Sequence, residues 1–475
     1  MTLPLPELFR SRTTESLGTS EAERLFAALD NGESPVSIRF NPYKIGSQPE
    51  GRQVPWCRYG YYLDERPQFT LDPAFHGGAY YVQEASSMFL EAIFRQIFEP
   101  DAAPRILDLC AAPGGKTTLL STLAGAEGLV VANEVIRQRA SVLTANAVKW
   151  GIGNIVVTNN DPAHFAPFEH YFDLIAVDAP CSGEGMFRKD TQATTEWSPA
   201  QVGVCAERQR EILSDVWDAL RPGGLLIYST CTYNREENED MIRFLCDHFD
   251  ATPLAAAPPA AWHIHPSLDK ELPAYRFMPH YTRGEGLFMA IVRKPGNADE
   301  CERDEWLQRA VRKNGKNRNK RPTAKGDTEV WRSWVSAPEK YVFDTDDESV
   351  TALPASLVPD YDLFATRFDI VHRGIPVASR KGREWQPHHA LALSTSLNTE
   401  AFDALPLTID ETIAYLRRET WPTLTDTRRG MRLVTCDGLP LGWCNHLGNR
   451  INNLYPQEWR IRSGYRPENP NLPVW

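Results

Sequence analysis

The chain has 475 residues, of which 42% are hydrophobic and 24% are charged, so it is long enough for several domains and has the composition of a globular protein. The formal net charge is -11 and the isoelectric point is near 5.6. Because the protein as a whole is acidic, any binding of nucleic acid would depend on local basic patches. The sequence has no apolar run of about 18 residues, no signal peptide and no Cys-x-x-Cys pair, so we expect a cytoplasmic, monomeric protein without a membrane span, a disulfide framework or a metal.

The first 300 residues divide into two regions. Residues 1–100 combine an amphipathic segment, Thr19 to Leu29, with a stretch rich in Pro and Tyr, and they predict a small accessory region. Residues 101–300 alternate short apolar strands with helical segments, which predicts βαβ units and a mainly parallel sheet of the doubly wound α/β class. The strands are expected at residues 105–108, 129–132, 155–158, 172–177 and 224–228.

A basic stretch precedes the C-terminal part of the chain. Between Trp306 and Lys325 the sequence has 8 Lys and Arg residues and no acid. We interpret residues 301–330 as a linker, which either only connects its neighbours or also contacts phosphates. Residues 331–376 and 377–475 are rich in Trp and Arg, and short strands and turns are expected there.

The first chemically informative motif is Asp108-Leu-Cys-Ala-Ala-Pro-Gly-Gly-Lys-Thr117, between a predicted strand and a helix. Gly114 and Gly115 allow the backbone to approach a ligand at this turn, where open α/β sheets bind nucleotide-like cofactors. A Walker loop would need glycine where this chain has Cys110, so phosphate binding of that kind is disfavoured.

Two acids follow the next strands. Glu134 stands about 20 residues beyond the glycines, where an acid can accept hydrogen bonds from ribose hydroxyls, and Asp161 follows the third strand, where it suits an adenine amino group. Either acid alone would more often be a helix cap. In this order they indicate adenosine bound across the strand ends.

Two cysteines are predicted to lie at neighbouring strand ends. Asp178 and Cys181 follow the fourth strand in Val177-Asp-Ala-Pro-Cys181, and Cys231 ends the fifth. A single cysteine at such a place is usually a buried small hydrophobe, but two of them beside a carboxylate make that interpretation weaker. Their spacing alone does not tell which of the two would be the nucleophile.

Methylation of carbon 5 of cytosine would use this set of groups. Carbon 5 is too electron-poor to attack a methyl sulfonium until a thiolate adds to carbon 6, which is covalent catalysis. Asp178, in its protonated form, could assist at N3, and the second thiol could assist release of the product. Because carbon 6 of a nucleobase stacked inside an RNA helix is out of reach of a thiolate, the target cytosine would be single-stranded or flipped out.

The motifs resemble those of the NOL1/NOP2/Sun family of RNA 5-methylcytosine methyltransferases. The resemblance rests on the cofactor motif, on Asp178-Ala-Pro-Cys-Ser-Gly183 and on Ser229-Thr-Cys-Thr-Tyr233, and it extends to Arg39-Phe-Asn41 and Asn234-Arg-Glu-Glu-Asn-Glu239. It implies a Rossmann-like fold that uses S-adenosylmethionine.

The same resemblance assigns roles to individual residues. It makes Cys231 the nucleophile and Cys181 the residue that aids product release, whereas DNA 5-methylcytosine enzymes attack with the cysteine of the fourth motif and lack the other. The residues that match the family's cofactor contacts are Cys110, Ala111, Ala112, Pro113, Gly114, Gly115, Lys116, Glu134, Asp161 and Asp178.

The C-terminal region resembles the tail of the bacterial members of the family that act on small-subunit rRNA. That tail contains a PUA-like RNA-binding domain of α+β structure, expected here at residues 377–475, and residues 1–100 are expected to contact RNA as well. The implied substrate is a cytosine in the decoding region of 16S rRNA, as naked RNA or in the small subunit. Alternatives are a tRNA or another rRNA cytosine, methylation of an exocyclic nitrogen, and a non-catalytic RNA-binding assembly factor.

Overall fold

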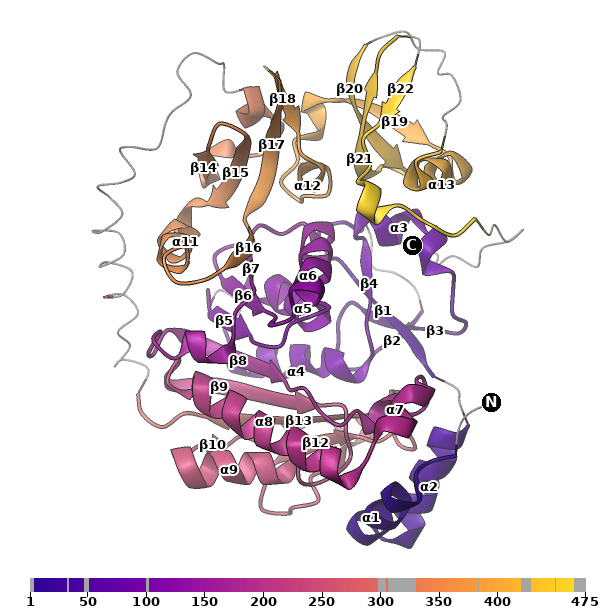
Figure 1. Ribbon diagram of the computed structural model, residues 1–475, viewed down its shortest axis with the longest axis vertical. Helices are drawn as coiled ribbons and strands as arrows, with labels where there is room; N and C mark the ends of the chain where they lie inside the picture. The colour runs from indigo at the N-terminus through magenta and orange to yellow at the C-terminus, as the bar shows by residue number, and fades with distance from the viewer. Residues whose placement is uncertain are drawn as a thin grey trace.

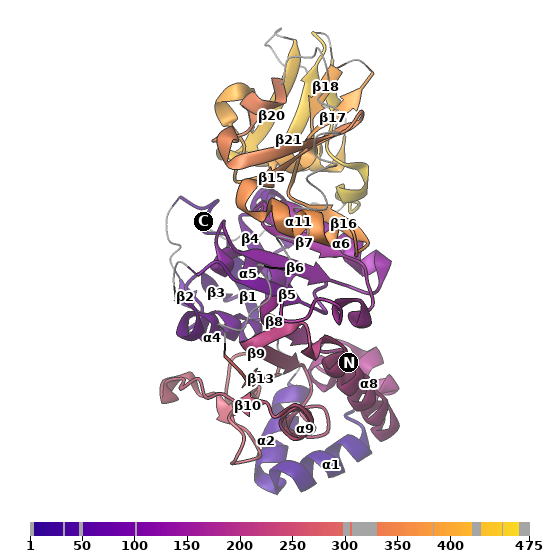
Figure 2. The same cartoon turned by 90° about the vertical axis from the view of Figure 1, so that its left-hand side faces the viewer.

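The computed structural model describes residues 4–31, 34–46, 51–99, 102–297, 305, 330–382, 384–419, 429–448 and 450–464. Helices α1 (Glu7–Leu17) and α2 (Thr19–Asp30) lie at one end of the molecule, a large sheet forms its middle, and two C-terminal sheets form the other end (Figure 1 and Figure 2). Apart from Glu305 and Val330, the predicted linker at residues 301–330 lies outside the described residues. No helix in the described parts is both long and apolar enough to span a membrane.

The large sheet has 10 strands among the described residues, and its order is β11-β12-β13-β9-β8-β5-β6-β7-β16, with β10 beside β13. The five parallel strands are β5 (Arg105–Asp108), β6 (Leu129–Asn133), β7 (Ile155–Thr158), β8 (Phe172–Asp178) and β9 (Leu220–Thr230). The antiparallel strands are β10 (Thr252–Pro253), β11 (His265–Pro266), β12 (Ala274–Phe277), β13 (Leu287–Arg293) and β16 (Ile370–Arg373). The chain adds β6 and β7 on one side of β5 and then adds β8 and β9 on the other, which creates a topological switch point between β5 and β8.

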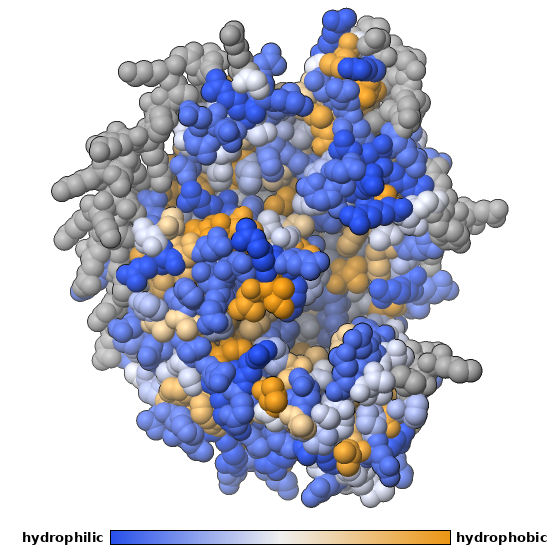
Figure 3. Space-filling model, viewed as in Figure 1, coloured by the Kyte–Doolittle hydropathy of each residue, from blue (hydrophilic) through white to orange (hydrophobic). Residues whose placement is uncertain are grey.

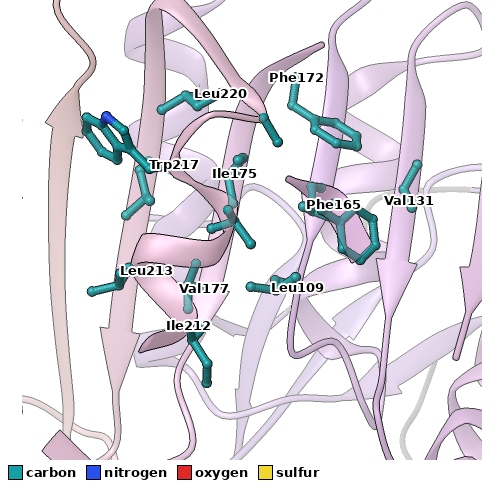
Figure 4. Packing of buried hydrophobic residues seen from close by; sticks show 14 of the residues in the cluster. Leu109, Val131, Phe165, Phe172, Ile175, Val177, Ile212, Leu213, Trp217 and Leu220 are labelled. Atoms are coloured by element: carbon teal, nitrogen blue, oxygen red, sulfur yellow. The ribbon is translucent and has the colours of Figure 1, made fainter. Parts of the chain in front are cut away.

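Helices cover both faces of this sheet because its strands are apolar on both sides. On β5, Ile106 belongs to the core under α4 (Phe89–Ile97) and α5 (Gly115–Ala124), whereas its neighbour Leu107 belongs to the core under α8 (Pro199–Trp217) and α9 (Glu239–Phe249). Figure 4 shows the second core, in which Ile175 and Val177 of β8 face Leu213 of α8. Helix α6 (Arg137–Trp150) packs through Leu143 over Ala132 of β6. The predicted doubly wound α/β fold is confirmed.

The N-terminal region contacts the catalytic region at two places. Helices α1 and α2 pack against the segment around α7 (Thr191–Glu196), where the ring of Phe9 lies 5.1 Å from Phe187 and 5.6 Å from Trp197. The second part of this region is a sheet of order β2-β3-β1-β4. Helix α3 (Pro73–Gly77) lies between β3 and β4 in the chain, and α4 follows the sheet. Its strands are β1 (Val36–Phe40), β2 (Arg52–Gln53), β3 (Gly60–Leu63) and β4 (Tyr80–Val82).

The C-terminal region contains two sheets, of order β14-β15-β17-β18 and β19-β20-β21-β22. The first consists of β14 (Tyr341–Thr345), β15 (Ser349–Pro354), β17 (Ile375–Lys381) and β18 (Glu384–Pro387), and the second of β19 (Asp403–Leu407), β20 (Gly430–Cys436), β21 (Leu439–His446) and β22 (Ile451–Asn453). Its helices are α11 (Val358–Phe364), α12 (His389–Ala392) and α13 (Ile409–Arg417). The boundary expected between residues 376 and 377 falls inside β17, so one sheet contains strands from both expected segments.

One piece of the C-terminal region is built into the catalytic core. Strand β16 pairs antiparallel with β7 and so extends the large sheet. Beside it, Phe364 of α11 and Phe368 pack on Phe168, and Phe368 stacks on that ring at 4.7 Å. The carboxylate of Asp360 is fully buried and is paired with Arg105 at 2.8 Å. Sequence patterns did not predict this connection, because the two halves of each contact lie about 200 residues apart in the chain.

Candidate active site

The ends of β8 and β9 place the two cysteines side by side. Strands β8 and β9 are parallel neighbours, with Asp178 opposite Ser229 in the register. Cys181 follows β8, Cys231 follows β9, and their Sγ atoms are 3.4 Å apart. Both residues are free, half-buried thiols at a separation of hydrogen-bonding contact rather than of a disulfide bond, which needs about 2 Å.

The surroundings of Cys181 keep its thiol protonated. The hydrogen bond with Cys231, followed by burial, raises the pKa of Cys181 well above its ordinary value. Either sulfur can donate its S–H to the other across this contact, so the geometry itself does not order the two thiols.

A buried carboxylate connects the loops that hold the two cysteines. Glu237 accepts hydrogen bonds from the backbone N–H and the hydroxyl of Ser182, from Nε2 of Gln209 at 2.9 Å and from Nδ2 of Asn234 at 2.8 Å. Burial raises the pKa of Glu237, and the hydrogen bonds from Ser182 and Asn234 act in the opposite direction. Because Ser182 follows Cys181 and Asn234 lies three residues after Cys231, Glu237 fixes both thiol loops at once.

A second carboxylate, Glu184, holds the same two loops further along. Its Oε2 accepts from the backbone N–H groups of Tyr233 and Asn234, and its Oε1 accepts from the indole of Trp197. The next residue, Gly185, donates its N–H to the carbonyl of Cys231 at 2.7 Å. A Cβ at Gly185 would lie 2.7 Å from that oxygen, so only glycine allows so close an approach.

Asp178 lies at the mouth of the site and is 41% exposed. Its Oδ2 is 2.8 Å from Nζ of Lys116, and its Oδ1 accepts from the hydroxyl of Ser229 at 2.8 Å. Burial lowers the pKa of Lys116, but the attraction of Asp178 outweighs burial, so the pKa is raised overall. Lys116 and Ser229 therefore hold the side chain of Asp178 in place at the strand end.

The loop between β5 and α5 has the shape of a ligand-binding turn. Gly114 has a φ of +113°, and a Cβ there would lie 3.0 Å from the side chain of Leu143. Arg139 donates to the carbonyl of Ala112, and Asn146 donates to that of Pro113. Helix α5 begins without a side-chain cap, so its first N–H groups can bind an anionic group at the strand ends.

Glu134 and Asp161 lie at the ends of β6 and β7, as predicted, and both also have structural roles. Oε1 of Glu134 accepts from the N–H of Ile136, and Oδ1 of Asp161 caps the short helix η3 (Pro162–Phe165). The two loops are joined by Asn159, whose Nδ2 donates to the carbonyl of Glu134 at 2.6 Å. The capping role is therefore present for Asp161, whereas Glu134 bonds the N-cap residue of α6 without capping that helix, and the two carboxylates lie at adjacent strand ends.

Reasoning from the sequence missed two supports of these loops. Arg39, a buried residue of β1, donates to Thr118 of α5 at 2.6 Å and to Gln83 at 2.7 Å, and burial lowers its pKa to about 10. A charged residue between two apolar ones in a strand was the available signal. The second support is the backbone of Asp369, whose carbonyl accepts from the N–H of Asn159 and whose N–H donates to Oδ1 of Asn160. No local sequence pattern could have revealed that pairing, because Asp369 lies 209 residues after Asn160.

Comparison with known proteins agrees with this architecture. A family model described as 16S rRNA methyltransferase RsmB/F matches residues 95–293, and models described as the N-terminal domain of 16S rRNA methyltransferase RsmF and the methyltransferase RsmF PUA domain match residues 5–85 and 402–461. Ribosomal RNA small subunit methyltransferase F of Cronobacter sakazakii is 32% identical over 490 aligned residues that cover 97% of each chain, and that of Shigella boydii is 31% identical with 98% of each covered. The chain belongs to the ribosomal RNA small subunit methyltransferase F family. The resemblance stated from the sequence motifs is thereby confirmed, including the PUA domain near the C-terminus.

Solved structures resemble about three fifths of the chain. A methyltransferase homolog protein from Pyrococcus horikoshii superposes with a TM-score of 0.53 at 29% identity and covers 61% of this chain and 95% of its own. NSun6 from the same organism, solved with SFG, has a TM-score of 0.52 at 20% identity, covers 62% of this chain and 99% of its own, and supports the fold alone. The Rossmann-like fold of S-adenosylmethionine-dependent methyltransferases is the one predicted from the sequence.

Proposed function

We propose that this protein transfers a methyl group from S-adenosylmethionine to carbon 5 of a cytosine in 16S rRNA, in the decoding region, through a covalent adduct on Cys231. The observation that carries the proposal is the pair of thiols, 3.4 Å apart, at the ends of neighbouring parallel strands. The membership of the chain in a family of 16S rRNA methyltransferases supports RNA as the substrate. We place this activity in the cytoplasm, on naked rRNA or on the small subunit.

The loops at the strand ends fit S-adenosylmethionine. The uncapped start of α5 suits the carboxylate of its methionine part, and the backbone from Cys110 to Lys116 can surround that part closely because Gly114 has a positive φ. Glu134 would accept from the ribose hydroxyls and Asp161 from the adenine amino group. When bound, this cofactor supplies an electrophilic methyl group.

The residues of this chain would act in sequence on the cytosine. The thiolate of Cys231 adds to carbon 6, the ring electrons shift so that carbon 5 becomes nucleophilic, and N3 takes up the proton that Asp178 carries in its protonated form. Asp178 is proposed to orient the N3 edge, with the ammonium of Lys116 beside it as the nearest cation. After methylation at carbon 5, a base removes the carbon-5 proton, the bond from carbon 6 to sulfur breaks, Cys231 leaves as a thiolate, and N3 returns its proton to Asp178. Cys181 is proposed to assist that release.

Substitution of each cysteine separates the two roles. Cys231→Ala should abolish methylation of 16S rRNA while S-adenosylmethionine still binds, as measured by calorimetry. Cys181→Ala should accumulate as a covalent RNA adduct, seen as a shifted band on a denaturing gel. Near-normal turnover by Cys231→Ala would overturn the assignment, and absence of an adduct in both Cys181→Ala and the wild type would overturn the division of roles.

The target nucleotide is tested separately in cells. Bisulfite sequencing of RNA from a deletion strain should show the loss of one 5-methylcytosine in the decoding region of 16S rRNA. Loss of a methylated cytosine in tRNA or at another rRNA site would keep the chemistry and change the substrate. Complementation with Cys231→Ala serves as the matched control, because it keeps the protein and removes the nucleophile.

A further inference from the structure

Two hollows flank the strand ends, and they share one residue, Arg66. The first has a volume of about 520 Å³ and is bounded by Arg66, Arg188 and Arg283, together with Ser34 and Thr282. The second has a volume of about 490 Å³ and is bounded by Arg66 and by the aromatic side chains of Phe69, Phe75 and Tyr81. We call the two hollows together the arginine groove. The face drawn in Figure 3 is hollowed between α6 and α7, on the side where the N-terminal sheet lies.

The first hollow is positively charged. Arg188 is buried and is paired with Glu285 at 3.1 Å, so its charge is balanced. Arg66 is exposed, and Arg283 is half-buried, donates to the carbonyl of Leu63 and lies over an aromatic ring. Within the described parts of the chain, neither Arg66 nor Arg283 forms an ion pair with a carboxylate, although Asp64 also lines the hollow. Two guanidinium groups are therefore left to bind an anion.

The second hollow has a different lining. Phe75 and Tyr81 are half-buried and, with Phe69, form an aromatic wall, and Arg66 lies over the ring of Phe69 at 5.6 Å. Asn146, also in the lining, donates to the carbonyl of Pro113 in the cofactor loop. An aromatic wall beside a guanidinium is the combination on which nucleic-acid bases stack.

Both hollows touch the catalytic loops. In the first, Arg188 donates to the carbonyl of Gly284, and the next carbonyl, that of Glu285, accepts from the hydroxyl of Tyr233 at 2.9 Å. Tyr233 lies two residues after Cys231. In the second, the ring of Tyr81 is 3.4 Å from the place where a Cβ on Gly115 would be. The arginine groove thus lies beside residues that contact the Cys231 loop on one side and the cofactor loop on the other.

We propose that the arginine groove holds the nucleotides that flank the target cytosine in a single-stranded stretch of RNA. A cytosine that enters the site must leave its stack, so its neighbours lose stacking partners and expose their phosphates. Arg66 and Arg283 bind the phosphates in the first hollow, because a guanidinium pairs with a phosphate through two parallel hydrogen bonds. A neighbouring base stacks on Phe75 and Tyr81 in the second hollow. This inference rests on the proposed function, since it presumes an RNA substrate.

The test measures binding of a short, fluorescently labelled single-stranded RNA that contains one cytosine, at several salt concentrations. Arg66→Ala and Arg283→Ala should each weaken binding by about ten-fold. Each should also reduce the slope of log Kd against log salt concentration by about one, because one phosphate contact is lost. Arg66→Lys keeps the charge and should retain the salt dependence. Phe75→Leu should weaken binding by about five-fold without changing the salt dependence, because it removes stacking and no charge.

Controls separate failure of the inference from failure of the proposed function. Arg208→Ala, on an exposed part of α8, should bind RNA like the wild type, and all variants should bind S-adenosylmethionine with unchanged Kd. If the wild type methylates 16S rRNA and both arginine-to-alanine variants bind the RNA normally, the groove is not the RNA site. If the wild type itself methylates no RNA cytosine, the proposed function fails and takes this inference with it.

Discussion

At the ends of β8 and β9 the reactive side chains are held by their own neighbours in sequence, whereas at the ends of β6 and β7 the loops are held by a distant segment. Glu237 and Glu184 fix the cysteine loops from within the stretch between residues 178 and 239. Asn159 and Asn160 instead pair with Asp369, which belongs to the region that continues into the PUA domain. The thiol loops are therefore held within the catalytic region, while the loops that we propose to bind adenosine, which we call the adenosine side, are held in part by the C-terminal part of the chain.

The largest expected effect concerns the anchor of that distant segment. Asp360→Ala removes a fully buried carboxylate that binds Arg105 and Tyr171, and it leaves the guanidinium without its partner. We expect a loss of about 3–5 kcal/mol in the free energy of unfolding, measured by urea denaturation. Asp344→Ala, which removes a partly exposed ion pair with Arg373, should cost less than about 1 kcal/mol. Equal losses in the free energy of unfolding for the two variants would contradict the proposal that the C-terminal segment is anchored to the catalytic region through Asp360.

The thiol side is tested by Glu237→Ala. This change leaves the buried donors of Ser182, Gln209 and Asn234 without their acceptor, and the cysteine loops should shift. We expect kcat to fall by about 100-fold, the usual result of a small misplacement of a reacting group, with little change in the Kd of S-adenosylmethionine. Glu236→Ala, at the neighbouring position, is the control. A change in Kd with unchanged kcat would contradict the separation of the two sides.

The adenosine side is tested by Asn160→Ala, which removes the side-chain hydrogen bonds to the backbone of Asp369. We expect the Kd of S-adenosylmethionine to rise by about ten-fold, since each net hydrogen bond contributes about 1 kcal/mol, while kcat at saturating cofactor stays close to that of the wild type. Asn452→Ala, at an exposed position of β22, should leave calorimetric binding unchanged. A normal Kd for Asn160→Ala would show that the loop keeps its shape without this contact.

The smallest expected effect concerns Asp108, on the strand between the two sides. Burial raises the pKa of its carboxyl to about 7, and Thr117 donates to its Oδ2. The folded state therefore holds a proton that the unfolded state releases near pH 4, so this contribution to stability is lost as pH rises through about 7. Relative to Asp108→Asn, the wild type should lose about 1 kcal/mol of unfolding free energy between about pH 6 and about pH 8. The same pH dependence in both proteins would contradict the raised pKa.

The elements around the chemistry were predictable because their signals are local. The strands before Asp108 and Asp178 are short apolar runs that end in turn residues, and the parallel alternation implies that their carboxyl ends share one edge of the sheet. On that argument Cys181 and Cys231 lie close together, and the 3.4 Å separation of their sulfur atoms agrees with it. The roles of the site residues remain predictions until the variants above are measured.

The sequence by itself determined the doubly wound α/β class, the order of the strand-end motifs and the family, because periodicity and short motifs depend on residues close together in the chain. The packing of distant segments sets Lys116 against Asp178, lets Glu237 join the two thiol loops, and adds β16 to the sheet beside the ends of β6 and β7. These contacts depend on which buried polar groups find partners once distant segments pack together, because a buried donor or acceptor without a partner costs free energy wherever the fold places it.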